Sequence, residues 1–220
     1  MHQDHVPRTL RILPVLPNLN RLAPVYFLRT CWRAVLGLLL AATIAGCGER
    51  AAFLNTDLTG LAYARDFQLT DHTGKPRSLA DFKGKAVLVF FGYTQCPDVC
   101  PTTMAAMAGV MQQLGKDAER LQVLFITVDP DRDTQELLAK YVPAFDPRFL
   151  GLRGNAEETA KVAKEFKVFY QKVPGEAPGS YTMDHTSGSY VFDPQGRIRL
   201  FVRNDQGTAS IVHDIRLLQK

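Results

Sequence analysis

Residues 86–101 read AVLVFFGYTQCPDVCP and join an apolar run to a pair of cysteines. The apolar part is uninterrupted, which is typical of a strand buried on both faces of a sheet. Asp98 is suited to the N-cap of a helix, and Pro101 is tolerated in its first turn, where a missing N–H costs little. The stretch therefore predicts a buried strand, a loop that carries Cys96 and a helix whose first turn carries Cys100.

The flanking sequence predicts further strands and helices in alternation. Apolar residues at helical spacing follow the cysteines; they are Met104, Met107, Val110, Met111 and Leu114. Asp131 or Asp133 is expected to cap the next helix, and Asn155 the one after it. The predicted elements are a hairpin over 67–76, a helix over 102–114, a strand over 122–128, helices ending near 141 and 166, a strand over 167–171, a hairpin of 189–192 with 197–201, and a helix over 208–218. This order indicates one α/β domain.

The first 47 residues are predicted to be a leader. They hold Arg29 and Arg33 and then an apolar run over 34–45, which is shorter than the about 20 residues that span a bilayer. A positive flank, an apolar run and small residues before a break are typical of a secretory signal. The Ile-Ala-Gly-Cys that ends at Cys47 resembles a bacterial lipobox, so Cys47 is a candidate lipidation site. A plain signal peptide and an uncleaved anchor are the alternatives. The 28 residues before Arg29 are too long for a normal n-region, which an over-called start codon would explain.

The net charge of +4 belongs to this leader. Residues 1–46 hold five of the 26 basic residues and one of the 22 acidic residues, so the remainder is formally neutral. A nucleic-acid partner is therefore not expected. We expect residues 48–64 to be a tether and residues 65–220 to form the folded domain.

Export would leave Cys96 and Cys100 as the unmodified cysteines, because Cys31 lies in the leader and Cys47 would carry lipid. Two neighbouring cysteines in an oxidising compartment form a disulfide, a redox pair or a metal site. The N–H groups at a helix N-terminus lower a thiol pKa. Metal binding and thiol–disulfide exchange both need the resulting thiolate. A purely structural disulfide would close a very short loop and stabilise the fold little.

Three segments resemble the Sco/SenC family of thioredoxin-like copper chaperones. They read GYTQCPDVCP at 92–101, TVDPDRD at 127–133 and YTMDHT at 181–186. The resemblance covers roughly residues 67–218. It implies an α/β, thioredoxin-like fold, with a central mixed sheet flanked by helices and an N-terminal hairpin extension. The cysteine spacing differs from the Cys-X-X-Cys of thioredoxin itself, which favours Sco over an ordinary reductase.

The resemblance also implies a copper site formed by Cys96, Cys100 and His185, for Cu(I) or Cu(II). Two soft thiolates and an imidazole suit copper in either oxidation state, whereas closed zinc sites use four protein ligands. A lone histidine is more often a surface or core residue, but the flanking Tyr-x-Met-Asp-His-Thr favours a ligand. Asp129 and Asp184 are assigned roles in orienting ligands or tuning thiol acidity. Their alternatives are a helix cap and a turn former.

Other potential metal donors are expected to have structural or surface positions. Met104, Met107 and Met111 could offer thioethers to copper, but their helical spacing favours core packing. His72 lies in a predicted turn and His213 in the last predicted helix, and both are expected to face solvent.

The function implied is that of a copper chaperone for cytochrome c oxidase. It would deliver copper to the binuclear copper site, or prepare the cysteines of that site, with subunit II of the oxidase or another copper chaperone as its partner. The protein would be exported and held at the membrane by lipid or an N-terminal anchor, facing the periplasm or the outer side of the inner membrane. A thiol–disulfide reductase with Cys96 and Cys100 as its catalytic pair is the alternative. A peroxiredoxin-like peroxidase is a third, because that superfamily shares the 67–76 hairpin and the Asp-Phe-x-Gly-Lys at 81–85.

Overall fold

The computed structural model describes residues 52–220. The predicted leader, with Cys31 and the candidate lipidation site Cys47, lies outside the described residues. Within them, no helix has both the length and the apolar character needed to cross a membrane.

Eight strands of the described part form one mixed sheet, in the order β1-β10-β9-β4-β5-β6-β2-β3. Their bounds are β1 Thr56–Asp57, β2 Leu69–Asp71, β3 Pro76–Arg77, β4 Ala86–Gly92, β5 Leu121–Thr127, β6 Leu150–Arg153, β9 Ser189–Phe192 and β10 Ile198–Val202. The central strands β4 and β5 are parallel, with Ala86 opposite Leu121 and Gly92 opposite Thr127. On its other side β4 pairs antiparallel with β9. The predicted α/β fold with a central mixed sheet is confirmed, and β2 and β3 form the predicted N-terminal hairpin.

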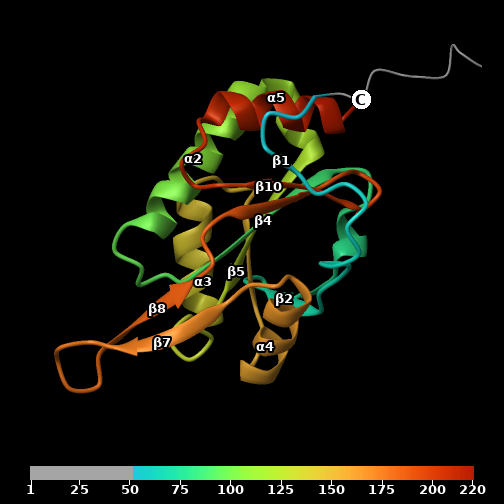
Figure 1. Ribbon diagram of the computed structural model, residues 1–220. Coiled ribbons are helices and arrows are strands. Elements are labelled where there is room, and N and C mark those ends of the chain that lie inside the picture. Colours follow the sequence, from blue (N-terminus) through green and yellow to red (C-terminus); the bar gives the residue numbers. More distant parts are fainter. Residues whose placement is uncertain (1–51) are drawn as a thin grey trace, which may run out of the picture. The chain divides into compact units, whose positions relative to one another are not determined.

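Four α-helices of residues 52–220 flank the sheet (Figure 1). They are α2 Val99–Leu114, α3 Gln135–Tyr141, α4 Ala156–Glu165 and α5 Thr208–Leu218, with short 3-10 turns η2 Leu79–Phe82, η3 Gly115–Arg120 and η4 Val142–Ala144. The helices α2 and α5 pack side by side, and the Gln113 amide donates to the Thr208 hydroxyl at 2.8 Å. Asn155 caps α4 as predicted, in a capping box with Glu158.

The cap of α3 differs from the prediction. The side chain of Thr134 accepts from the Leu137 N–H, whereas Asp131 and Asp133 lie outside the helix and have other partners. A threonine hydroxyl can satisfy this helix end in place of a carboxylate. Asp133 is therefore free to bind elsewhere.

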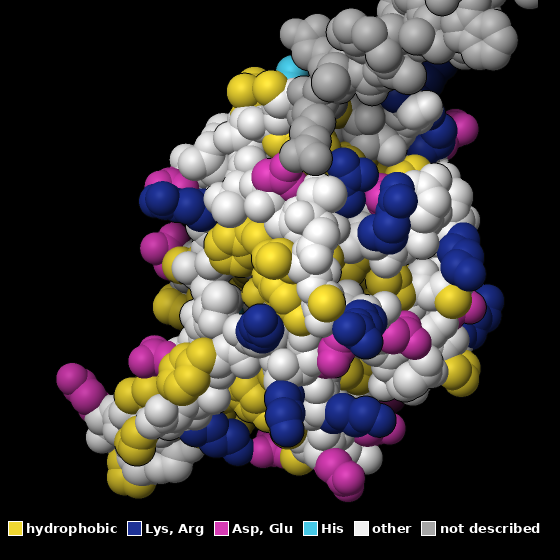
Figure 2. Space-filling model, turned by 45° about the vertical axis from the view of Figure 1, so that its right-hand side comes forward, with side chains coloured by type: hydrophobic (Ala, Val, Ile, Leu, Met, Phe, Trp, Pro, Cys, Tyr) yellow, Lys and Arg dark blue, Asp and Glu magenta, His cyan; other side chains and the backbone are white. Residues whose placement is uncertain are grey.

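The core is built from β4, β5 and the helices over them. Every residue of β4 is buried, as the continuous apolar run predicts. Aromatic rings meet edge to face within the core, with Phe91 and Phe166 at 5.2 Å between centroids. The methionines predicted to pack in the core, Met104, Met107 and Met111, are at most 3% exposed. On the face shown in Figure 2, basic and acidic side chains are interspersed and are not gathered by sign.

The segment before residue 65 takes part in the fold, although the sequence assigns it to a tether. Its strand β1 pairs with β10 at the edge of the sheet. Leu54 and Asn55 donate their backbone N–H groups to the buried carboxylate of Asp214 in α5, at 3.0 and 2.9 Å. The described part of the predicted tether therefore packs on the domain.

A second sheet was not predicted. Strands β7 Tyr170–Pro174 and β8 Tyr181–His185 pair antiparallel as a two-stranded sheet of their own. The hairpin projects from the body of the domain in Figure 1. The sequence predicts a strand that ends at residue 171 and a loop after it, so the hairpin corrects both boundaries. Because His185 is the last residue of β8, this hairpin decides where the histidine lies.

Candidate metal centre

The two cysteines occupy the positions predicted for them at the end of β4. Helix α2 begins at Val99 with Asp98 as N-cap, which leaves Cys96 in the loop and Cys100 in the first turn. Both are free thiols, Cys96 partly buried and Cys100 fully buried. The thiols are close enough to hydrogen-bond to each other.

The two thiols differ in acidity because their surroundings differ. Burial acts to raise the pKa of Cys96, but the N–H groups of Cys100, Asp98 and Val99 donate to its sulfur and bring the pKa below its ordinary value. These groups belong to the N-terminus of α2, where unpaired N–H donors stabilise an anion. Burial raises the pKa of the Cys100 thiol strongly, and the N–H of Tyr93 offsets only part of this effect. Cys96 is therefore the thiol that ionises first.

His185 presents one ring nitrogen to the cysteines. Its Nε2 lies 3.9 Å from the Sγ of Cys100, and its Nδ1 lies 3.0 Å from the backbone carbonyl of Thr186. A carbonyl only accepts, so Nδ1 carries the hydrogen and the Nε2 lone pair faces Cys100. Burial lowers the pKa of His185, against the opposing effects of the Thr186 carbonyl and Asp184. The imidazole is therefore held neutral, in the tautomer that a metal ligand needs.

Aromatic rings and a glycine fix the space around these donors. The His185 ring meets Phe90 and Tyr93 edge to face, at 6.4 and 6.1 Å between ring centres. Gly92 has no side chain where one would collide: a Cβ there would lie 2.9 Å from the Sγ of Cys100 and 2.9 Å from the ring of Phe125. The last residue of β4 must therefore be glycine for Cys100 to reach its position.

In the part of the chain that the structure describes, no group of three or more His, Cys, Asp or Glu side chains is placed so that it could hold a metal ion. The described geometry instead brings Cys100 and His185 into contact, with the Cys96 thiol beside Cys100. A shallow cavity of about 410 Å³ opens over this site; its lining residues include Cys96, Val99, Phe169, Asp184 and His185. The site is therefore accessible from one side.

The predicted supporting carboxylates lie at different depths. Asp129 is buried, accepts a hydrogen bond of 2.9 Å from the Tyr181 hydroxyl and forms an ion pair with Arg132. Its contacts reach the start of β8 and do not include a cysteine. Asp184 is exposed beside His185 at the rim of the cavity.

Asp133 supports the cysteine loop, a role that the sequence analysis missed. Its buried carboxylate accepts from the N–H and hydroxyl of Thr94, at 3.1 and 2.6 Å, and from the hydroxyl of Thr127 at 2.6 Å. Burial raises the pKa of Asp133, and these hydrogen bonds oppose the shift. Asp133 thus ties the loop before Cys96 to the end of β5. In the segment TVDPDRD the sequence favours Asp129 as the supporting carboxylate and offers Asp133 only as a helix cap.

The two other histidines of the described residues have structural surroundings. His213 is exposed, as predicted, and its Nδ1 lies 2.9 Å from the Asp214 carboxylate. His72 is partly buried, contrary to the prediction, because its Nδ1 accepts the Gly151 N–H at 3.0 Å. Burial lowers the pKa of His72.

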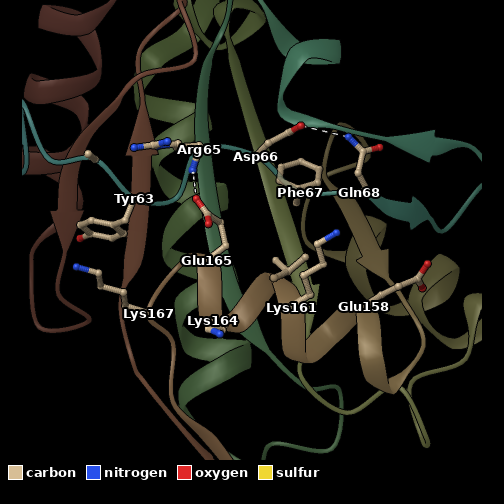
Figure 3. Close-up of a pocket in the computed structure, with 12 residues that line it drawn as sticks. Tyr63, Arg65, Asp66, Phe67, Gln68, Glu158, Lys161, Lys164, Glu165 and Lys167 are labelled. Atoms are coloured by element: carbon tan, nitrogen blue, oxygen red, sulfur yellow. Dashed lines mark hydrogen bonds between the residues drawn. The ribbon is translucent and has the colours of Figure 1, made fainter.

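A larger groove of about 730 Å³ lies elsewhere, between residues 62–68 and helix α4 (Figure 3). Its charged side chains engage near neighbours. Glu165 accepts the Arg65 N–H at 2.8 Å, and the Lys167 ammonium lies 4.3 Å from the Tyr63 ring centre. None of its described lining residues is a cysteine or a histidine.

Comparison with known proteins agrees with this geometry. The family model described as SCO1/SenC matches residues 56–220. The mitochondrial SCO2 homologue of Bos taurus is 39% identical over 153 residues, which cover 69% of this chain and 58% of that protein. The human mitochondrial SCO1 homologue is 39% identical over 132 residues, which cover 59% of this chain and 44% of its own length. The chain thus matches about half the length of these relatives.

Solved structures share the fold. The copper-bound structure of ScoI from Bradyrhizobium japonicum is 41% identical, with a TM-score of 0.66 over 71% of this chain and 99% of that one. The apo Sco1 of Thermus thermophilus is also 41% identical, with a TM-score of 0.69 over 78% of this chain and 99% of that one. The match of the family model over most of the chain, together with these structures, shows that the chain belongs to the SCO1/SenC family.

Proposed function

We propose that this protein binds copper through Cys96, Cys100 and His185 and acts as a copper chaperone in the assembly of cytochrome c oxidase. It would deliver copper to the binuclear copper site of the oxidase or prepare the cysteines of that site. The observation that carries the proposal is the approach of His185 Nε2 to Cys100 Sγ, 3.9 Å apart, with the Cys96 thiol beside them.

The donor set fits copper as cargo. Two thiolates and one neutral imidazole are ligands that Cu(I) and Cu(II) accept, and a site with no fourth protein ligand is less suited to structural zinc. The helix N-terminus stabilises the Cys96 thiolate before metal arrives, and the Thr186 carbonyl fixes the histidine tautomer. The copper-bound family member of B. japonicum shows that this fold holds the metal in a relative.

An anaerobic copper titration tests the ligand set. Reduced protein should take up one Cu(I), and Cys96→Ser, Cys100→Ser and His185→Ala should each bind it at least tenfold more weakly. His213→Ala is the matched control, because this histidine is exposed on α5 and away from the cavity. Copper binding that survives in the three variants would exclude the assignment.

A thiol–disulfide reductase is the second candidate. The observation in its favour is the division of labour between the thiols: Cys96 is partly exposed with a lowered pKa, whereas Cys100 is buried. The first suits attack on a disulfide and the second suits resolution of the mixed disulfide. A His185→Ala protein that has lost copper yet still restores oxidase assembly would favour this function over delivery.

A peroxidase is the third candidate and uses the same sulfur. It requires that the reduced protein consume hydrogen peroxide catalytically, with Cys96 as the attacking thiolate. A coupled peroxide assay on the wild type and Cys96→Ser distinguishes this activity from both others.

We also propose that the protein is exported and tethered to a membrane, with Cys47 as the lipid-bearing residue. The leader composition supports this location, and the relatives include mitochondrial proteins and a SCO1/SenC family lipoprotein of Bacillus anthracis. Subunit II of the oxidase or another copper chaperone is the partner proposed. Labelling of cells with a fatty-acid probe should mark the wild type and not Cys47→Ser.

A further inference from the structure

We infer that Arg132 is a positioning residue that holds the hairpin β7–β8, and with it His185, against the cysteine loop. Part of its test rests on the proposed copper site, and part does not depend on copper. Arg132 follows β5 and contacts the two other segments that bring the donors together. It was not selected from the sequence, where it stands inside the segment TVDPDRD.

The guanidinium of Arg132 reaches three segments at once. Its Nη1 donates to the side-chain oxygen of Gln95, next to Cys96, at 3.1 Å and to the backbone carbonyl of Tyr181 in β8 at 2.8 Å. Its Nε forms the ion pair with Asp129, whose carboxylate is 1% exposed. One side chain therefore links the cysteine loop, the end of β5 and the start of β8.

Stacking adds to these hydrogen bonds. The guanidinium carbon lies 3.6 Å from the ring centre of Tyr181 and 5.6 Å from that of Tyr93. Tyr93 in turn meets the ring of His185 edge to face. The Tyr181 hydroxyl closes the arrangement by donating to Asp129 at 2.9 Å. Arg132, Asp129 and Tyr181 thus bind one another in a closed triangle.

The hairpin needs such a link because it shares no strand pairing with the eight-stranded sheet. In the described structure, its other ties to the body include the packing of the His185 ring on Phe90 and Tyr93. Met183 is buried, the backbone of Met183 bonds the Tyr93 side chain, and Lys172 pairs with Asp131 at the surface. An exposed ion pair of this kind contributes little to holding the hairpin in place. The charge-assisted hydrogen bonds of the largely buried Arg132 guanidinium contribute more.

The side chain must be arginine for geometric reasons. A guanidinium is a planar fork that can bond in two directions while its face stacks on an aromatic ring. A lysine ammonium is a compact charge on a flexible stem and cannot meet Asp129, the Tyr181 carbonyl and Gln95 in this arrangement. Arg132→Lys therefore preserves charge and removes the fork.

The first test uses metal-free full-length protein and amide hydrogen exchange. Arg132→Lys and Arg132→Gln should both speed exchange in residues 181–186 at least tenfold, while β4 and β5 keep their protection. Arg153→Lys is the matched control, because Arg153 donates to the carbonyls of Pro130 and Asp133 in the same loop, both at 3.2 Å. Unchanged exchange, full protection in Arg132→Lys, or an equal effect in Arg153→Lys would each overturn the positioning role.

The second test uses copper alone as the probe. Arg132→Gln should weaken copper binding about 10- to 100-fold, as loss of a residue that orients a ligand typically does, and should diminish the histidine nitrogen coupling in the Cu(II) resonance spectrum. In a His185→Ala background the same substitution should cost less than threefold, because its effect passes through His185. Equal losses in the two backgrounds would overturn the inference. Failure of the wild type to bind copper would sink the proposed function, yet hydrogen exchange would still decide the role of Arg132.

Discussion

At the residue scale, Gly92 leaves the space that the Cys100 sulfur and two core aromatic rings occupy. A methyl group at this position would lie 2.9 Å from the Cys100 sulfur and from the rings of Phe125 and Phe90. Gly92→Ala should therefore destabilise the fold by about 1–3 kcal/mol, as overpacking does, and displace Cys100 from His185. Chemical denaturation and copper titration measure the two effects.

Gly109 provides the matched control for that substitution. It lies within α2, and a Cβ there would find its nearest neighbour at 3.8 Å, in Thr208. Gly109→Ala should stabilise the protein by about 0.5–1 kcal/mol through helix propensity and leave copper binding unchanged. Equal behaviour of the two alanine variants would contradict the packing argument.

At the element scale, two of the three aspartates in the loop after β5 have opposite roles. Asp133 is fully buried and binds Thr94 and Thr127, whereas Asp131 is exposed and pairs only with Lys172 in the described contacts. Asp133→Ala leaves three donors without an acceptor and should cost about 3 kcal/mol of unfolding free energy. It should also speed alkylation of Cys96, because the loop from Thr94 to Cys96 loses its anchor.

Asp131→Ala is the control within the same loop. It removes a surface ion pair, which contributes little, so neither the denaturation midpoint nor the alkylation rate of Cys96 should change measurably. If this variant loosened Cys96 as much as Asp133→Ala does, the loop as a whole would be responsible and the buried carboxylate would not.

At the scale of the whole molecule, Asp214 joins the two ends of the described chain. Its carboxylate in α5 accepts from the N–H of Leu54 and from the N–H and side-chain amide of Asn55, at 2.8 to 3.1 Å. Asp214→Ala should lower the free energy of unfolding by about 3 kcal/mol and expose the bonds near residue 55 to proteases. Asp205→Ala, which breaks an exposed pair with Arg203, should do neither.

Acid stability also belongs to the whole molecule, and Asp71 contributes to it. Burial alone would raise its pKa, but bonds from Thr73, Arg77 and the Lys75 N–H lower the pKa from 3.8 to about 2. A carboxylate whose folded pKa is lowered stabilises the fold above its unfolded pKa, and that contribution disappears as pH falls through the folded value. Here the contribution is about 2 kcal/mol. It should be complete at pH 5 and lost between about pH 4 and pH 2.

Asp71→Asn isolates this contribution. Denaturation curves should show the variant less stable than wild type at pH 7, with the difference shrinking as the pH approaches 2. A difference that stays constant across this range would show that packing, and not charge, accounts for the effect.

The predictable parts of the fold are those that a short stretch of sequence determines by itself. The continuous apolar run predicted β4, and Asp98 with Pro101 predicted the start of α2 between the two cysteines. The hairpin β7–β8 escaped prediction because half of its ten strand residues are exposed and only Met183 is buried, so the apolar signal is weak. Strand β1 is two residues long and depends on β10 for its existence.

The candidate site was predictable in its donors and not in its supports. Cysteine and histidine can be recognised as candidate metal ligands from their residue type alone. The anchoring role of Asp133 depends on two threonines, one of them 39 positions away in the chain. Among several neighbouring carboxylates that could each cap a helix, only three-dimensional contacts distinguish the one that holds the cysteine loop.

Because β7 and β8 form a sheet of their own, the candidate donors lie on two separate parts of the domain: the main domain with its eight-stranded sheet, and the hairpin of residues 170–185. Both cysteines lie on the main domain, with Cys96 in the loop before α2 and Cys100 in its first turn. His185 lies on the hairpin, at the end of β8. Replacing the hairpin with another segment would therefore change the third donor and leave every strand pairing of the eight-stranded sheet intact. If the proposed copper site holds, the sixteen residues from Tyr170 to His185 decide whether the two cysteines act as a dithiol alone or together with a third donor.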